Sequence, residues 1–308
     1  MKTVVVTGSS TGIGWGAAKV LISHGFRVFG SVRNAADADR LAHELGANFS
    51  PLLFDVTDAP AVAKAADIVA AALAGETLLG LVNNAGIAVP GPLLHLPVDD
   101  FRRQLEVNVT GQLIVTQAFA PLLETDASRK GPPGRIVMIS SVGGRNASPF
   151  LGPYSASKFA LEGLSESLRR ELMVDGIDVI VIAPGAVATP IWDKAQALDV
   201  SAYADTPYAP ALAAGKDYMI ALGRNGFPPE KIGRTILTAL TSPRPRTRYT
   251  VTPDPLQEFL VNNLPKRMVD RIICATIGLR AKAQSGAAPR RSSRRDDLRQ
   301  RTLRSEIS

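Results

Sequence analysis

The chain has 308 residues, 45% of them hydrophobic and 20% charged, and it carries a formal net charge of +7. This composition excludes a disordered or fibrous protein and fits one large α/β domain or two smaller ones. A single cysteine, Cys274, excludes an internal disulfide, and three scattered histidines give no metal-ligand spacing.

The first predicted element is a buried strand followed by a glycine-rich turn. Residues 2–6 are a β-branched run, which leads into residues 7–14 (T-G-S-S-T-G-I-G) and then into a helical pattern. This order predicts a dinucleotide site, because the start of a helix offers unpaired N–H groups and a positive dipole end to phosphates. We expect Gly8 to permit the turn, Gly12 to let the backbone approach the phosphates, and Gly14 to let helix and strand pack.

Strand-like and helix-like segments alternate along the rest of the chain. This alternation predicts an α/β fold, a doubly wound parallel sheet of the Rossmann type, in a single domain. The proposed sites follow strand ends, where ligands bind in open α/β sheets. Further strands are predicted at residues 27–32, 49–54, 78–82, 135–140, 179–183 and 249–251, with helices at 101–123 and 154–174.

The second strand ends in Ser31, Val32 and Arg33. NAD enzymes place an acid here to hold the ribose 2′-OH, and Val32 stands in that place. An arginine suits a 2′-phosphate because of its charge and its planar fork of donors. Arg33 therefore favours NADP(H) over NAD(H) as the cofactor.

Tyr154 and Lys158 lie four residues apart in a helical segment, so both side chains share one helix face. A nearby ammonium is expected to lower the pKa of the phenol by stabilising the phenolate. Such a pair can pass a proton to or from an alcohol or ketone oxygen.

Two segments follow the sixth strand. Residues 191–229 are less regular and rich in Ala, Pro and Tyr, so we expect a small lid over the substrate at about 190–230. Residues 265–279 predict an amphipathic helix, and docking on its own domain is favoured over a membrane surface or a second subunit. Its apolar stripe consists of Met268, Val269, Ile272, Ile273 and Ile277.

Most of the positive charge lies at the end of the chain. Residues 280–308 hold nine basic and three acidic residues, which accounts for +6 of the net charge. We expect a catalytic domain over 1–282 and a basic, disordered tail over 283–308. A nucleic-acid or membrane contact by the tail is the disfavoured alternative, since no aromatic residues are interleaved to stack on bases.

Five motifs, in order, resemble the short-chain dehydrogenase/reductase superfamily over about the first 250 residues. The stretch around Tyr154 is most similar to hydroxysteroid and retinol dehydrogenases. The motifs are residues 7–14, Asp55-Val56, residues 83–86 (N-N-A-G), Ser141 with Tyr154 and Lys158, and Pro184-Gly185 followed by Thr189.

The resemblance implies four catalytic residues. Ser141 would hold the substrate oxygen, since its register to Tyr154 fits better than that of Ser140. Tyr154 would be the proton donor and acceptor. Lys158 would lower the pKa of Tyr154 and bind the nicotinamide ribose. Asn108 would help seat a water for proton relay, or alternatively only bend its helix.

The resemblance also implies the cofactor contacts, from the adenine end to the nicotinamide end. Thr11 departs from many NADP-preferring members, which carry a second basic residue there. Besides Tyr154 and Lys158, the predicted contacts are Gly8, Ser10, Thr11, Gly12, Ile13, Gly14, Arg33, Asp55, Val56, Asn83, Ala85, Gly86, Pro184, Gly185, Val187 and Thr189.

The sequence thus predicts an NADP(H)-dependent oxidoreductase that interconverts a secondary alcohol and a ketone or aldehyde, with a lipophilic, steroid- or retinoid-like substrate. Two alternatives are a reductase of small or acyl-thioester carbonyls and a non-catalytic NADP(H)-binding sensor or scaffold. The resemblance implies a homodimer or homotetramer. We expect a cytoplasmic protein without a metal, because no signal peptide precedes the first strand and no apolar run reaches about 18 residues.

Overall fold

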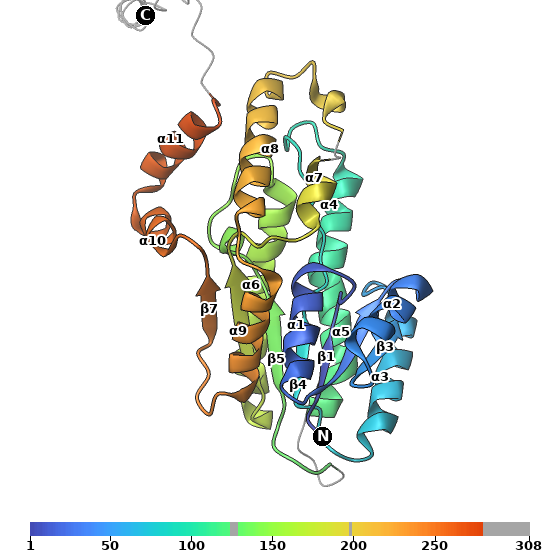
Figure 1. Cartoon of the computed structure of the whole chain (residues 1–308). Helices are drawn as coiled ribbons and strands as arrows, with labels where there is room; N and C mark the ends of the chain where they lie inside the picture. Colours follow the sequence, from blue (N-terminus) through green and yellow to red (C-terminus); the bar gives the residue numbers. More distant parts are fainter. Residues whose placement is uncertain (124–128, 197–198, 280–308) are drawn as a thin grey trace, which may run out of the picture. The chain divides into compact units, whose positions relative to one another are not determined.

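The computed structural model describes residues 1–123, 129–196 and 199–279. Seven parallel strands form one sheet in the order β3-β2-β1-β4-β5-β6-β7 (Figure 1). The predicted doubly wound parallel sheet is therefore confirmed. The strands are β1 (Thr3–Val6), β2 (Arg27–Val32), β3 (Phe49–Leu53), β4 (Gly80–Asn83), β5 (Arg135–Ile139), β6 (Asp178–Pro184) and β7 (Arg248–Val251).

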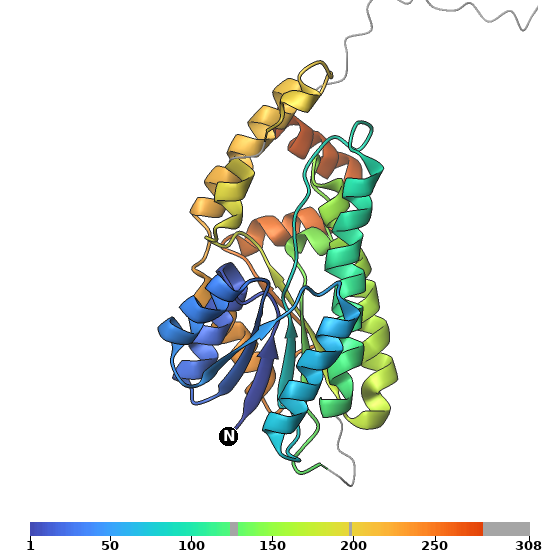
Figure 2. The same cartoon turned by 90° about the vertical axis from the view of Figure 1, so that its right-hand side faces the viewer.

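Helices cover both faces of the sheet, as Figure 2 shows. Val4 and Val6 of β1 pack against one helical layer and Val5 against the other, so the strand is buried on both sides. One layer consists of α1 (Gly12–Ser23), α2 (Ala35–Leu45) and α9 (Pro229–Thr241), and the other of α3 (Ala59–Leu73), α5 (Gly111–Leu123) and α6 (Gly152–Glu171).

The remaining α-helices follow the carboxyl ends of β4, β6 and β7. The strand order reverses between β1 and β4, which is where open α/β sheets form a ligand crevice. These helices are α4 (Val98–Leu105), α7 (Ile191–Gln196), α8 (Ala209–Arg224), α10 (Pro255–Asn263) and α11 (Lys266–Thr276).

Two predicted segments differ from the structure. The helix expected over 101–123 is interrupted by a π-helical turn, Glu106–Thr110 (η1), between α4 and α5. The expected irregular lid contains the 16-residue helix α8, because its Ala- and Leu-rich sequence has high helix propensity and a proline stands in its first turn.

Gly16 allows α1 and α9 to pack closely. A Cβ on Gly16 would lie 2.7 Å from the Pro229 main chain, and one on Gly233 would lie 2.6 Å from the Gly16 carbonyl. The propensity cost of about 1 kcal/mol for glycine inside a helix is thus offset by packing that alanine could not make.

The C-terminal helix only partly follows the expectation of docking. Val269 is buried, whereas Met268 and Ile272 are 49% and 51% exposed. Residues Met1–Gly278 form one compact unit, and the predicted tail lies outside the described residues. Within the part of the chain described, no helix is long and apolar enough to cross a bilayer, and no cluster of three metal-ligating side chains occurs.

Candidate active site

The loop between β1 and α1 has no room for side chains at its glycines. Gly8 and Gly12 have φ angles of +67° and +62°, which favour glycine. A Cβ on Gly14 would overlap the Gly8 carbonyl and lie 2.6 Å from Asn84 Nδ2. Thr11 makes no side-chain cap to α1, so the first N–H groups of the helix remain available to an anion.

The turn at residues 83–86 is clamped to this loop. Thr7 Oγ1 accepts hydrogen bonds from the N–H groups of Asn84, at 2.9 Å, and Ala85, at 3.0 Å. Asn84 Nδ2 donates to the Thr7 carbonyl at 2.8 Å. Asn83 is fully buried and donates to Thr116 Oγ1 at 2.8 Å, which ties β4 to α5. Asn84, which the sequence does not predict as a contact residue, joins the turn after β4 to the loop after β1.

A cavity of about 530 Å³ lies where the adenine end of a dinucleotide was expected. Arg33 and Asp55 line it, together with Arg102 and Arg103 of α4. Asp55 Oδ1 accepts from Thr57 N–H at 3.0 Å, which fixes the carboxylate. The exposed Arg33 side chain forms no hydrogen bond or ion pair with the described residues.

Arg40 is a basic residue near the phosphate loop that sequence reasoning missed. Its guanidinium donates to the Ser10 carbonyl at 2.7 Å and pairs with Asp37 at 2.7 Å and Glu44 at 3.4 Å. The hydrogen bond from Arg40 holds the pKa of Asp37 below its usual value. Arg40 is 30 residues from Ser10 in the sequence, so only the fold brings it to the phosphate loop. In this loop Thr11 stands at a position where a basic residue could have supplied a cation.

Asn108 sits in the π-helical turn and is fully buried. Its Oδ1 accepts from Ile87 N–H at 2.8 Å, and its Nδ2 donates to the Ile87 carbonyl and to Ser157 Oγ, both at 3.0 Å. The side chain thus bonds to backbone and lies at a helix distortion, as expected of this residue. Ser157, three residues beyond Tyr154, is a supporting contact that the sequence did not single out.

Ser141, Tyr154 and Lys158 meet beyond the carboxyl end of β5. Ser141 Oγ accepts from Gly143 N–H at 3.0 Å. The Ser141 side chain also forms a hydrogen bond with the side chain of Tyr154. The Lys158 ammonium lies 5.7 Å from the centre of the Tyr154 ring and donates to the Ile139 carbonyl at 2.8 Å. Ser140 Oγ is buried and has no hydrogen-bond partner among the residues that the structure describes. The geometry therefore brings Ser141, and not Ser140, to the tyrosine.

Burial dominates the titration of this group. It raises the pKa of Tyr154, and the hydrogen bond with Ser141 works in the opposite direction. Burial also lowers the pKa of Lys158 to about 8, against a smaller opposite effect of Glu162. In the folded chain burial is the largest influence on Tyr154, and it places the pKa of the phenol above its usual value. The Lys158 ammonium meanwhile donates to a main-chain carbonyl.

The segment after β6 closes over the glycine loop. Thr189 is close to Gly12, where a Cβ would lie 3.3 Å from the Thr189 methyl group. Gly185 N–H donates to the Val251 carbonyl at 2.8 Å, and Val187 is buried. The predicted nicotinamide segment therefore lies against the predicted phosphate loop.

The comparisons with known proteins decide the family. The sequence model of the short chain dehydrogenase family matches residues 2–199. The chain belongs to this family. The dehydrogenase is therefore an NAD(P)-dependent oxidoreductase that acts on CH–OH groups.

Three known proteins show how far the similarity extends. The NADPH-dependent 3-dehydrocapnine reductase of Ornithobacterium rhinotracheale is 38% identical, over 88% of this chain and 96% of its own. Human retinol dehydrogenase 5 is 34% identical, over 88% of this chain and 87% of its own. The structure of a short-chain dehydrogenase from Streptomyces avermitilis superposes with a TM-score of 0.69 at 26% identity, covering 90% of this chain and 97% of that one.

An aromatic cluster of this dehydrogenase joins three connections near the candidate catalytic residues. Phe150 stacks edge-on against Tyr208, with ring centres 6.2 Å apart, and His95 does so at 5.7 Å. Gly91 N–H donates to the Phe150 carbonyl at 2.8 Å. Phe150 has a φ of +64°, which is unfavourable for a bulky residue and is held by these contacts.

Proposed function

We propose that this dehydrogenase uses NADP(H) to interconvert a lipophilic secondary alcohol and the corresponding ketone or aldehyde. The observation that carries the proposal is the meeting of Ser141, Tyr154 and Lys158 at the same sheet edge as the glycine loop. A proton donor, an oxygen-binding hydroxyl and a phosphate cradle thus open onto one region of the fold.

The residues present fit a dinucleotide with a 2′-phosphate. An added Cβ at Gly8 or Gly14 would collide with neighbouring main chain, and Gly8 and Gly12 have positive φ angles, so this loop offers main-chain N–H groups and no side chains to the phosphates. Arg33 has its donors available beside the cavity at the adenine end. We assign the remaining cofactor contacts to the predicted residues from Ser10 to Thr189, with Lys158 at the nicotinamide ribose. NADPH dependence is also the printed property of the reductase from Ornithobacterium rhinotracheale.

In this proposal the bound nicotinamide supplies the hydride. In the reductive direction Tyr154 donates a proton to the substrate oxygen, since a phenol is protonated at neutral pH, and in the oxidative direction its phenolate accepts the proton from the alcohol. Ser141 donates a hydrogen bond to the same oxygen and so stabilises the charge that develops there. Asn108 holds Ile87 and Ser157 in place and thereby fixes the helix that carries Tyr154.

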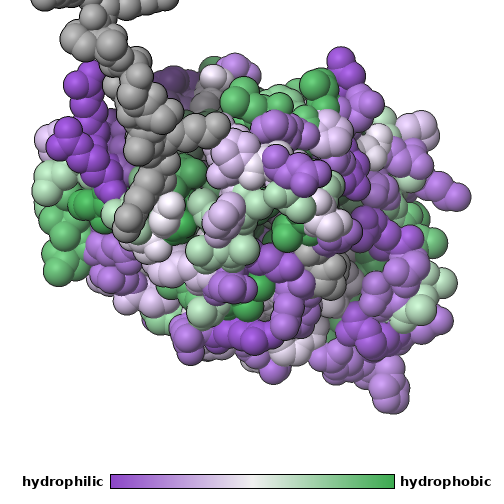
Figure 3. All heavy atoms as spheres, turned by 90° about the horizontal axis from the view of Figure 1, so that it is seen from above, coloured by the Kyte–Doolittle hydropathy of each residue, from purple (hydrophilic) through white to green (hydrophobic). Residues whose placement is uncertain are grey.

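The surroundings favour an apolar substrate. The aromatic cluster of Phe150 and Tyr208 adjoins the catalytic loop, and large side chains such as Leu93 and Leu94 are exposed nearby. Figure 3, which views this end of the molecule, shows hydrophobic areas separated by hydrophilic ones. We assign the substrate cover to the segment at about 190–230, in which α7 packs against α8 through Trp192 and Gly223. Human retinol dehydrogenase 5, a relative, is named for a lipophilic alcohol.

The proposal is tested by a substrate panel with the purified full-length chain. NADPH oxidation and NADP reduction are measured with steroids, retinoids, quinones and small ketones, and with NADH and NAD in parallel. We expect turnover with a lipophilic carbonyl, and a loss of about two or more orders of magnitude in kcat in Tyr154→Phe with NADPH binding retained.

Tyr249→Phe on β7 is the matched control, since it removes a phenol hydroxyl whose one hydrogen bond within the described part of the chain is the one it accepts from Arg246 N–H. Near wild-type turnover in Tyr154→Phe would contradict the assigned mechanism. Preference for acyl-thioesters would favour the alternative substrate class. Light scattering on the same preparation tests the expected homodimer or homotetramer.

A further inference from the structure

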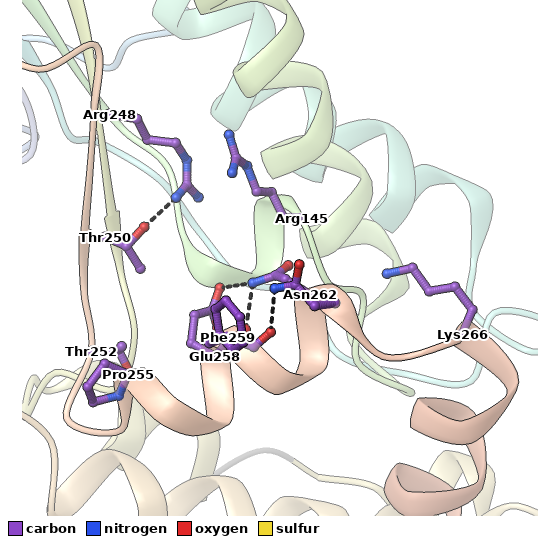
Figure 4. A pocket seen from close by; sticks show the side chains of 10 residues that line it. Arg145, Arg248, Thr250, Thr252, Pro255, Glu258, Phe259, Asn262 and Lys266 are labelled. Carbon is purple, nitrogen blue, oxygen red and sulfur yellow. Dashed lines mark hydrogen bonds between the residues drawn. The ribbon is translucent and has the colours of Figure 1, made fainter.

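A second cavity, of about 670 Å³, lies beside the edge strand β7 and carries no assigned role. Its walls come from the loop after β5, from β7, from α10 and from the start of α11 (Figure 4). Three cations line it, namely Arg145, Arg248 and Lys266, and Glu258 is the carboxylate among its lining residues.

The cations differ in how they are compensated. Arg248 Nε is 3.1 Å from Glu162 Oε2, and both side chains are largely buried, so this charge is neutralised. Arg145 and Lys266 have no side-chain hydrogen bond or ion pair to any described residue. Glu258 Oε1 accepts from Asn262 Nδ2 at 2.7 Å. The cavity is therefore left with two uncompensated cations and one carboxylate.

The polar groups around these cations suit an anion. Lys266 is the first residue of the 11-residue helix α11, whose N-cap Pro265 provides no side-chain cap. Its first N–H groups and positive dipole end add to the charge of the side chains. Thr250 and Thr252 contribute hydroxyl donors from β7. In Figure 4 the side chains of Arg145 and Arg248 lie above α10, and Lys266 extends from the start of α11 toward the same space.

Two of the segments that line the cavity are adjacent to segments of the candidate active site. Arg145 is four residues beyond Ser141 in the loop after β5. Thr252 packs against Gly185, where a Cβ would lie 2.8 Å from Thr252 Oγ1. A molecule held by Arg145 and Thr252 would thus be next to the two segments assigned to the substrate oxygen and to the nicotinamide.

We propose that this cavity is an anion site that takes a carboxylate, sulfonate or phosphate group, and that it holds the charged end of a substrate whose apolar part lies toward the aromatic cluster. The second clause rests on the proposed function. Arg145 and Lys266 contribute charge-assisted hydrogen bonds, and Arg248 orients the Thr250 hydroxyl to which it donates.

The test uses the full-length protein with NADPH and two matched ketone series. Oxodecanoates with the keto group at different positions are compared with their methyl esters at constant ionic strength. We expect at least one acid to exceed its ester in kcat/KM by about tenfold, and Arg145→Gln and Lys266→Gln each to remove most of that preference. The keto position in the acid with the highest kcat/KM indicates the distance between the bound carboxylate and Tyr154.

Arg267→Gln is the control, because it removes the neighbouring charge on α11 outside the cavity and should leave the preference intact. Turnover of the neutral esters reports the proposed function alone, so the two proposals fail separately. If the enzyme shows no preference for the acids, calorimetric titration with sulfate and phosphate tests whether the cavity binds a free anion instead of the charged end of a substrate. Saturable binding that Arg145→Gln weakens and Arg267→Gln does not would support the site, and its absence together with equal turnover of acids and esters would overturn it.

Discussion

The two halves of the candidate ligand-binding edge of the sheet are built from different parts of the chain. Around β1 and β4, main-chain groups form the site, and Gly8, Gly12 and Gly14 exclude side chains from it. Around β5 to β7, side chains form the candidate site, with Tyr154 and Lys158 both carried by α6. The difference predicts that substitutions in the first half act on folding and binding together, and that those in the second half act on chemistry and charge.

Gly14→Ala should have the largest effect, because the added Cβ would overlap the Gly8 carbonyl. We expect a loss of about 1 to 3 kcal/mol in the free energy of unfolding from overpacking, and NADPH binding reduced beyond detection. Urea denaturation and fluorescence titration with NADPH measure the two effects.

Gly163→Ala in α6 is the matched substitution in the second half. It faces open space and should leave stability equal or higher by up to about 1 kcal/mol. Equal behaviour of the two variants would remove the distinction between the halves.

Lys158→Met tests whether the second half tolerates loss of a buried charge. The pKa of Lys158 lies near 8 in the folded chain and at 10.5 ordinarily, so between these values the unfolded chain binds more protons. Stability of the wild type should therefore rise with pH from about 8 toward 10.5, by up to about 3 kcal/mol from this group. Lys158→Met lacks this rise and should lose activity while remaining folded.

Urea denaturation of both proteins at several pH values between 7.5 and 10 measures the difference. The advantage of Lys158→Met in unfolding free energy should be largest at the lowest pH and shrink as pH increases. A difference independent of pH would show that the buried ammonium is not strained by desolvation.

Arg33→Gln should have a smaller effect, confined to cofactor choice. Loss of a charge-assisted contact to the 2′-phosphate is expected to reduce the ratio of kcat/KM for NADPH to that for NADH by about 10- to 100-fold. Arg40→Gln should reduce it only a few-fold, because this guanidinium is already paired with Asp37 and Glu44. An unchanged ratio in both variants would contradict the assignment of Arg33 to the 2′-phosphate.

The sequence alone determined the elements whose pattern is local. The β-branched runs of β1 and β5 and the order of glycines from Gly8 to Gly14 follow from backbone sterics and two-sided burial, which act within a few residues. The alternation of these elements was enough to predict the parallel sheet, and family membership followed from the same motifs. The edges of the candidate site were predictable because each motif directly follows a strand.

Only the tertiary structure decided what depends on contacts between distant segments. It brought Arg40 to Ser10, Asn84 to Thr7 and Pro229 to Gly16, and it placed Arg145, Arg248 and Lys266 around one cavity. It also decided the direction in which burial shifts the pKa of Tyr154, since desolvation depends on the whole surrounding fold whereas the spacing to Lys158 is local. Burial and long-range juxtaposition are properties of the packed chain, and no periodicity in the sequence encodes them.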